Sequence, residues 1–279
     1  MSLNGGRLGV LAGRGDLPKD IIEFCLTNDV DCYALLFKGQ SDLPADIDVL
    51  SDTVRLGQTQ KSIDLLKKNG CTHIVFAGHI QRPGLLDLRP DLRTARFFTR
   101  LGLGAAGDDR LLRAIRQELE GEGFLILGAQ DILPGLLTPN GALTNDQPNA
   151  ADWSDIRYGA AILETISPFD IGQSCVVQQG MVLGIEAIEG TTALIERAGN
   201  HKRKGESGVL VKRAKAGQDM ALDVPTIGEQ TIEEIKKAGL KGIALEAERS
   251  QILNMSETVA AAEAAGVFIV GFHADDVHE

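Results

Sequence analysis

Two glutamates in the second half of the chain are placed where they could bind a cation. Glu186 and Glu189 follow the apolar run 181–185, and Gly190 and Thr191 come next. Carboxylates at the start of a helix either cap it or bind a hard cation such as Mg²⁺. A metal-activated water that attacks phosphorus would need such ligands and nearby cationic side chains. The chain offers Arg14, Arg82 and Lys212 for the cationic role.

A further carboxylate, Asp223, lies in the polar segment 215–228, which also contains Gln218, Thr226 and Gly228. Proline disfavours helix in the residue before it, so the segment before Pro225 should be extended. The side chain of Asp223 then points away from those of its two apolar neighbours. Composition alone assigns Asp223 to a turn. The alternative is that carboxylates from separate strand ends gather around Mg²⁺.

A glycine-rich loop in the first half could bind phosphate. It consists of Gly13, Arg14, Gly15, Asp16 and Leu17. Glycines free backbone N–H groups, and a helix N-terminus adds partial positive charge. A tight structural turn is the alternative. The loop resembles the dinucleotide fingerprint, but Pro18 replaces the third glycine, and Lys38 ends the second strand without the acidic residue that binds a nicotinamide ribose. A nicotinamide-dependent oxidoreductase is therefore the less favoured hypothesis.

Two further groups lie near the ends of predicted elements. They are Gly78, His79 and Arg82 around the end of an apolar strand, and Asp108 and Asp109 before a helix. Open α/β sheets bind ligands at the carboxyl ends of their strands. The two aspartates are either N-caps or contacts to a cation or a sugar hydroxyl.

The elements that position these residues alternate between strand and helix. Apolar strands in the first half indicate a parallel sheet covered on both faces. We expect an α/β fold, with a Rossmann-like domain at 1–137 and a mixed α/β domain at 138–279, joined by a linker within 133–147. The predicted strands are 8–12, 32–37, 54–56, 73–80, 124–127, 173–177, 181–185, 209–211, 242–245 and 267–272. The predicted helices are 17–28, 58–69, 108–120, 150–166, 229–238 and 257–265.

Composition excludes several classes of protein. The chain has 279 residues, 43% of them hydrophobic and 24% charged, which suits two domains with sizeable cores. A net charge of −11 makes a nucleic-acid partner improbable. No apolar run is long enough to span a bilayer, and Met1–Gly6 is unlike a signal peptide. The four cysteines form no CxxC pair, so we expect buried thiols in the cytoplasm.

Several segments together resemble the UDP-2,3-diacylglucosamine pyrophosphatase family of the LpxI type, which acts in lipid A biosynthesis. The similarity runs in order over nearly the whole chain. It is carried by residues 8–18, 76–78 with 82–83, 107–109 with 111–113, 170–173, 182–183 with 186–191, 223–228, and 239–240 with 242–244 and 246–247.

The resemblance implies Mg²⁺-dependent hydrolysis of UDP-2,3-diacylglucosamine to UMP and 2,3-diacylglucosamine 1-phosphate, with water attacking the sugar-side phosphorus. It implies that the lipid substrate lies between the two domains, that the protein is a homodimer, and that it is peripheral on the inner face of the inner membrane. Asp223 matches the family's essential aspartate and is expected to be a metal ligand or to activate water. Glu186 and Glu189 are the next metal ligands expected. A non-catalytic nucleotide- or lipid-binding protein remains the other alternative.

The residues expected to bind substrate come from both halves. They are Gly13, Arg14, Gly15, Asp16, Leu17, Gly78, His79, Arg82, Asp108, Asp109, Gly190, Thr191, Lys212, Gln218, Thr226 and Gly228.

Overall fold

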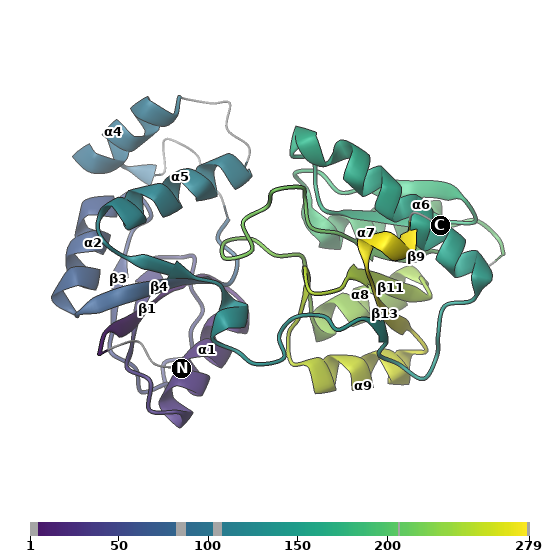
Figure 1. Cartoon of the computed structure of the whole chain (residues 1–279), viewed down its shortest axis with the longest axis horizontal. Helices are drawn as coiled ribbons and strands as arrows, with labels where there is room; N and C mark the ends of the chain where they lie inside the picture. The colour runs from purple at the N-terminus through teal and green to yellow at the C-terminus, as the bar shows by residue number, and fades with distance from the viewer. Residues whose placement is uncertain (1–4, 82–87, 103–107, 206, 278–279) are drawn as a thin grey trace. The chain divides into compact units, whose positions relative to one another are not determined.

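The computed structural model describes residues 5–81, 88–102, 108–205 and 207–277 (Figure 1). The chain divides into two compact units. The first comprises Met1–Pro134 with Asp219–Leu222, and the second comprises Gly135–Gln218 with Asp223–Glu279. The first unit thus includes a short segment that the sequence assigned to the second domain.

The first unit contains a five-stranded parallel sheet with the order β3-β2-β1-β4-β5. The predicted Rossmann-like parallel sheet is therefore confirmed. The chain leaves β1 in one direction and later returns to its other side as β4, which makes the β1–β4 edge a topological switch point. The strands are β1 (Arg7–Ala12), β2 (Cys32–Phe37), β3 (Ser51–Val54), β4 (Cys71–Ala77) and β5 (Leu125–Leu127).

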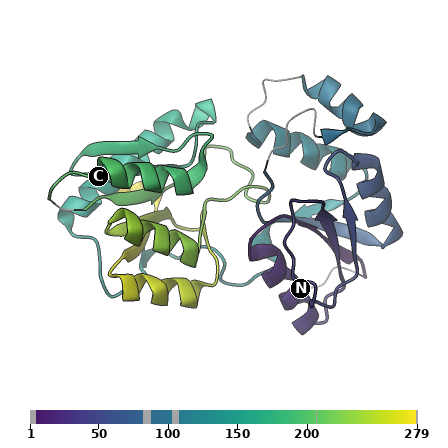
Figure 2. The same ribbon diagram turned by 180° about the vertical axis from the view of Figure 1, so that it is seen from behind.

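Helices cover the faces of this sheet (Figures 1 and 2). They are α1 (Leu17–Thr27), α2 (Thr59–Lys68) and α5 (Asp108–Gly121), whereas α4 (Leu92–Leu101) packs against α2. A short 3₁₀ turn spans Ala129–Asp131. Helix α4 was not predicted. Its N-cap is Asp91, whose carboxylate accepts the Thr94 N–H at 2.8 Å. Thr94 is the one residue of this helix that is buried.

The second unit contains a six-stranded mixed sheet with the order β6-β13-β11-β9-β7-β8. Strands β9, β11 and β13 are parallel, whereas β6, β7 and β8 run antiparallel to their neighbours. A separate two-stranded pair joins β10 to β12. The strands are β6 (Gly141–Ala142), β7 (Ser174–Gln178), β8 (Met181–Ile185), β9 (Val209–Lys212), β10 (Thr226–Ile227), β11 (Gly242–Glu246), β12 (Gln251–Ile252) and β13 (Phe268–Phe272).

The expected linker is part of this fold, because β6 lies within 133–147 and pairs with β13. The helices are α6 (Ala150–Ile166), α7 (Gly190–His201), α8 (Glu229–Ala238) and α9 (Met255–Ala265), with 3₁₀ turns at Ser167–Phe169 and Ala274–Val277. Among the described residues, no helix is both long enough and apolar enough to cross a membrane.

Alternation along the strands gives the second sheet two different apolar faces. On one face, Leu210 and Leu245 pack with the buried side chains of α7, α8 and α9. On the other, Val211 and Ala244 pack with the inward side of α6 (Figures 1 and 2). This alternation decides where the charged residues at the strand ends point.

Candidate active site

Polar residues from several elements meet at one edge of the second sheet. Lys212 is the last residue of β9 and pairs in register with Ser174, the first residue of the antiparallel β7. Cys175 pairs in turn with Ile185, the last residue of β8. The end of β9, the start of β7 and the end of β8 therefore share an edge, which brings Glu186 close to Lys212.

Lys212, Thr191 and Glu186 form a chain of hydrogen bonds at this edge. The Lys212 ammonium, only 2% exposed, donates to Thr191 Oγ1 at 2.8 Å. The Thr191 hydroxyl donates to Glu186 Oε1 at 2.8 Å, and the Gln173 N–H donates to Glu186 Oε2 at 3.1 Å. Three predicted residues are thus brought together, and Thr191 links the cation to the carboxylate.

Asp223 is held by a second group of polar side chains. The Gln218 amide donates to Asp223 Oδ2 at 2.7 Å and to Gln173 Oε1 at 3.1 Å. Gln218 is itself fixed, because its Oε1 accepts the Lys215 N–H at 2.7 Å. Within the described part of the chain, no residue donates to Asp223 Oδ1. One carboxylate oxygen is therefore oriented by the protein, and the other is available to a ligand.

Burial shifts the charged groups of the site toward their neutral forms. It lowers the pKa of Lys212, although the negative charges of Glu186, Asp223 and Glu234 act in the opposite direction. Burial also raises the pKa of Asp223, against Lys215, the Gln218 hydrogen bond and Lys212, and Glu186 raises it further. Hydrogen bonds through Gln173 and Gln218 also connect Glu186 to Asp223, so the charged groups belong to one polar cluster.

The loop before β7 packs directly on this site. Asp170, which has a left-handed φ of 55°, forms an ion pair with Lys215. A Cβ at Gly172 would lie 2.1 Å from the Glu186 carbonyl oxygen, so only glycine fits there. Asp170, Gln173 and Lys215 were not predicted as site residues. The matching segment 170–173 was the only sequence signal for the first two.

A second charged cluster lies on the other face of the same sheet. Arg213 Nε lies 3.4 Å from Glu246 Oε1, and Arg213 Nη1 donates to Glu164 Oε2 at 3.2 Å. Residues 212 and 213 point to opposite faces because side chains alternate along a strand. Glu246, the last residue of β11, is therefore held in a buried ion pair on the opposite face of the sheet from Lys212.

Glu189, the remaining predicted metal ligand, is engaged elsewhere. Its carboxylate lies 2.6 Å from Arg197 of α7. A backbone hydrogen bond lowers the pKa of Glu189, and the hydrogen bond from Arg197 lowers it further. Across the described residues, no three His, Cys, Asp or Glu side chains gather closely enough to hold a metal ion.

The other predicted residues of the second unit lie at two helix starts and in a short strand. Gly190 opens α7 with φ 81°, and Gly228 precedes α8 in an extended conformation. Thr226 lies in β10, and its hydroxyl donates to the Val224 carbonyl at 2.8 Å. Their contact with substrate remains a prediction.

In the first unit, the structure brings two predicted loops together at the switch point. Arg14 N–H donates to the His79 carbonyl at 2.8 Å, and His79 N–H donates to the Arg14 carbonyl at 2.9 Å. A Cβ at Gly13 would lie 2.6 Å from the His79 carbonyl oxygen, and a Cβ at Gly78 would lie 2.4 Å from that of Arg14. Both glycines are therefore needed for the two loops to approach.

The N–H groups of the two glycines in the glycine-rich loop already have partners. Gly13 N–H donates to the Ala77 carbonyl at 2.7 Å, and Gly15 N–H donates to the Asp42 carboxylate at 3.1 Å. Asp16 precedes α1, but its side chain makes no capping hydrogen bond. Leu17 is the first residue of α1. Asp42 was not predicted, and its carboxylate stands where the phosphate was expected.

Three predicted residues cannot be compared with the structure. Arg82 lies outside the described residues. Asp108 and Asp109 begin α5, but the positions of their side chains are not described.

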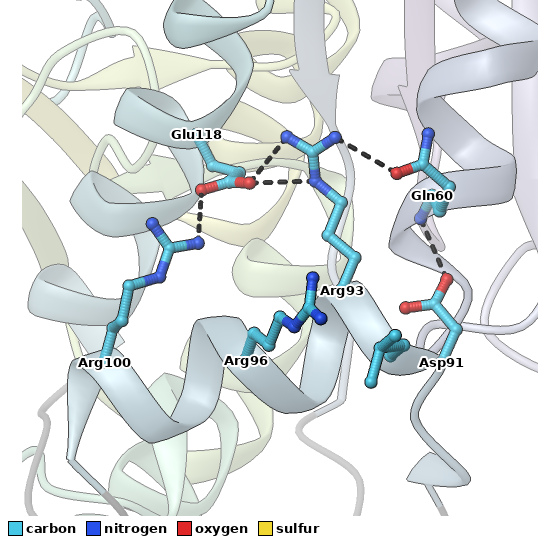
Figure 3. A pocket seen from close by; sticks show the side chains of 7 residues that line it. Gln60, Asp91, Arg93, Arg96, Arg100 and Glu118 are labelled. Carbon is cyan, nitrogen blue, oxygen red and sulfur yellow. Dashed lines mark hydrogen bonds and ion pairs between the residues drawn. The ribbon is translucent and has the colours of Figure 1, made fainter.

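A cavity of about 580 Å³ lies beside α4 in the first unit, at a place that the sequence did not indicate. Figure 3 shows Arg93 bound to both Glu118 and Gln60, while Arg96 extends along the helix without a bond to the residues drawn. The spacing of arginines at 93, 96 and 100 places them on one side of α4 and could have revealed this face. The lining residues are Gln60, Asp91, Leu92, Arg93, Arg96, Arg100 and Glu118.

Comparison with known proteins places both units in one family. Residues 7–136 match the LpxI N-terminal domain, and residues 139–270 match the LpxI C-terminal domain. The chain is 34% identical over 272 residues to a protein of Caulobacter vibrioides named UDP-2,3-diacylglucosamine pyrophosphatase LpxI, covering 95% of this chain and 97% of the relative. A solved structure named CobK precorrin-6A reductase shares 10% identity at a TM-score of 0.35, over 95% of this chain and 87% of that one, which is too low to support an argument. The chain belongs to the LpxI family.

Proposed function

We propose that this chain hydrolyses the pyrophosphate bond of UDP-2,3-diacylglucosamine, giving UMP and 2,3-diacylglucosamine 1-phosphate. Membership of the LpxI family and the name of the Caulobacter relative support this substrate. The observation that carries the proposal is the buried Lys212, which hydrogen bonds connect to Glu186 through Thr191 and onward to Asp223 through Gln173 and Gln218. A buried cation beside carboxylates suits a pyrophosphate, which is anionic and reacts with water.

The residues of the site take different roles in this proposal. Lys212 neutralises negative charge that develops on the phosphate oxygens as water attacks. Asp223 either accepts a proton from the attacking water or holds a metal ion beside it. Burial raises the pKa of Asp223, which makes its carboxylate a stronger base than an exposed aspartate. Gln218 holds Oδ2, so the reaction would use Oδ1.

Mg²⁺ is part of the proposal, and Asp223 and Glu186 would hold it. Mg²⁺ in proteins binds through one or two carboxylates and keeps water and substrate phosphates as its other ligands, so two carboxylates fit it. Each carboxylate oxygen has two lone pairs, and one hydrogen bond does not prevent coordination. When bound, the ion neutralises phosphate charge and lowers the pKa of bound water. Glu189 is the least favoured ligand because it pairs with Arg197.

Apolar side chains around the site support a lipid substrate. Phe169 is 74% exposed, Ile171 is 41% exposed and Ile188 is fully exposed at 103%. Phe169 and Ile171 flank Asp170, which pairs with Lys215, and Ile188 lies two residues after Glu186. We name these three residues the apolar rim and propose that it contacts the acyl chains. Peripheral association with the inner membrane and a homodimer belong to the same proposal.

The test is to incubate the protein with UDP-2,3-diacylglucosamine and Mg²⁺ in ¹⁸O-labelled water and to separate the products. We expect UMP and a lipid phosphate, with the label in 2,3-diacylglucosamine 1-phosphate. Label in UMP would contradict attack at the sugar-side phosphorus. Full activity in excess chelator would exclude the metal. Substrate binding without UMP release would favour a non-catalytic binding protein, and tight NAD binding would favour an oxidoreductase.

A further inference from the structure

We propose that Cys25 and Cys32 form an oxidation site in the first unit, where a hydroperoxide converts the two thiols into an intramolecular disulfide. The inference does not depend on the proposed hydrolysis, because both residues belong to the first unit, whereas the polar cluster belongs to the second.

A short, hydrogen-bonded loop fixes the two cysteines relative to one another. Cys25 lies in the last turn of α1, and Cys32 is the first residue of β2. The Asn28 and Val30 N–H groups donate to the Cys25 carbonyl at 3.3 and 2.9 Å. The Leu8 N–H donates to the Asp31 carbonyl at 2.9 Å, which holds the end of the loop on β1.

The side chains of Cys25 and Cys32 lie on the same face of the sheet. Tyr33 and Leu35 of β2 pack in one cluster with Leu66 of α2, so alternation directs Cys32 to the opposite face. Helix α1 connects β1 to β2, and α2 connects β3 to β4 in the opposite direction across the sheet. Because such crossovers are right-handed, the two helices lie on opposite faces, and α1 lies on the face of Cys32. Cys25 is among the residues that α1 buries, so the Cys25 and Cys32 side chains both lie on the face of the sheet that α1 covers.

The surroundings give the two sulfurs different reactivity. The hydrogen bond from Cys25 lowers the pKa of Cys32, and Arg7 lowers it further, against partial burial and Asp31. The same hydrogen bond and complete burial raise the pKa of Cys25. Cys32 is half-buried and can meet a small oxidant. Oxidation-sensitive cysteines combine thiolate character, access to solvent and a neighbouring second thiol, and Cys32 has all three.

The chemistry proceeds in two steps. The Cys32 thiolate attacks one peroxide oxygen, so that an S–O bond forms, the O–O bond breaks and the released oxygen leaves as water after taking a proton. Cys25 sulfur then attacks the Cys32 sulfenic acid; the S–S bond forms, the S–O bond breaks, and the hydroxyl leaves as water with the proton from Cys25. The two thiols are oxidised by two electrons, and hydrogen peroxide is reduced to two molecules of water.

The other cysteines provide internal controls. Cys71 is buried among the residues that pack with α2, and burial raises its pKa to about 11. Cys175 is fully buried in the second unit, and burial raises its pKa to about 12. Neither combines access to solvent with thiolate character, so both should stay reduced.

The experiment treats the folded full-length chain with hydrogen peroxide, alkylates remaining thiols after denaturation, and digests it with trypsin. Cys25 and Cys32 fall on one peptide, residues 20–38, because no lysine or arginine lies between Asp20 and Phe37. We expect the mass of this peptide to fall by two hydrogen atoms, and we expect its thiols to become available for alkylation only after reduction. Cys71 and Cys175 should be alkylated without reduction. Cleavage before Asp29 and Asp31 should leave two fragments joined by a reducible bond.

Variants identify the order of the steps. Cys25→Ala should stop at a Cys32 sulfenic acid that dimedone traps, and Cys71→Ala should behave as the unchanged protein. Three outcomes in the unchanged protein would each overturn the proposal. They are separate alkylation of both thiols after peroxide treatment, a sulfenic acid that never becomes a disulfide, and a disulfide to Cys71. These outcomes are read by mass spectrometry and do not involve hydrolytic activity.

Discussion

The Asp223 carboxylate is held on one side by Gln218, so a substitution that keeps this hydrogen bond tests the proposed role in turnover apart from a role in folding. Asp223→Asn keeps the size of the side chain and an oxygen that can accept the Gln218 hydrogen bond, but it removes the charge and the base. We expect turnover to fall by about 10²–10⁴-fold, as is typical for loss of a general base. Substrate binding should be retained.

The control for Asp223→Asn is Asp146→Asn, at an exposed position of the same unit. Rates of UMP release, substrate titration and thermal unfolding should be measured for both variants. If Asp223→Asn turns over at the unchanged rate, or loses activity only because it unfolds, Asp223 is not at the reacting centre.

Lys212 is a buried cation whose nearest partner is a hydroxyl, so an anionic ligand would complete its environment. Lys212→Met retains the apolar stem and removes the charge. We expect kcat/KM to fall by about 10²–10³-fold, which is the usual effect of removing one stabilising donor. Because burial lowers the pKa of Lys212, activity that needs the ammonium should decline at a lower pH than for an ordinary lysine.

Lys212→Met should therefore remove the alkaline decline from the pH profile as well as lower the rate. The matched control is Lys236→Met on the exposed side of α8. An alkaline decline that is the same in Lys212→Met and in the unchanged protein would assign it to another group.

Part of the site could be predicted at the scale of residues, and part could not. Glu186, Thr191, Lys212, Gln218 and Asp223 were all identified from their positions beside apolar segments and from the family resemblance. Their connections depend on strand register and alternation, because adjacent residues at a strand end point to opposite faces. The sequence therefore did not separate Lys212 from the ion pair that Arg213 forms with Glu246.

At the scale of elements, apolar periodicity predicted most strands and helices of both sheets. It failed for α4, where little is buried, and it placed the third strand at 54–56 instead of Ser51–Val54. Exposed residues fill three of the four positions of that strand, so its pairing with β2 leaves no alternating signal. The contact between the Gly13–Gly15 loop and the Gly78–His79 loop could not be predicted from periodicity, because the paired residues Arg14 and His79 lie far apart in the sequence.

The approach of these two loops predicts a sharp effect at Gly78. Gly78→Ala would place a Cβ 2.4 Å from the Arg14 carbonyl oxygen at a position where φ is 80°. We expect a loss of about 1–3 kcal/mol of unfolding free energy or more, from strain and steric conflict. Gly121→Ala at the end of α5, where a Cβ meets nothing within 4 Å, is the matched control. Equal denaturation midpoints for the two variants would show that the loops do not approach as described.

The apolar rim predicts an effect that depends on the substrate. Phe169→Ser with Ile188→Ser removes exposed apolar surface without changing the polar site. We expect KM to rise several-fold for substrate with long acyl chains and to change little for a short-chain analogue, since burial of apolar area contributes about 25 cal/mol per Å². The control is Tyr158→Ser, an exposed residue of α6. Equal KM changes for both substrates would separate the rim from acyl-chain binding.

At the scale of the whole molecule, the chain passes between the two units three times, after Pro134, Gln218 and Leu222. Asp219–Leu222 belongs to the first unit although it is flanked by residues of the second. Ala221 and Leu222 pack on the first core, and the Asp219 carboxylate lies 2.5 Å from Arg116. The sequence could not show this, because a four-residue segment has no periodicity that distinguishes one core from another.

This connectivity predicts that a substitution late in the sequence destabilises the first unit. Leu222→Ala removes a half-buried side chain from that core, and we expect a loss of about 1–2 kcal/mol, below the 2–5 kcal/mol typical of fully buried leucines. Hydrogen exchange should show faster opening of β1 and β4. The fluorescence of Trp153, the single tryptophan, which lies in α6 of the second unit, should show an unchanged transition there. Leu92→Ala, at a position 68% exposed in the first unit, should leave both signals unaltered. If Leu222→Ala changed the Trp153 transition and left β1 exchange unchanged, residues 219–222 would support the second core instead of the first.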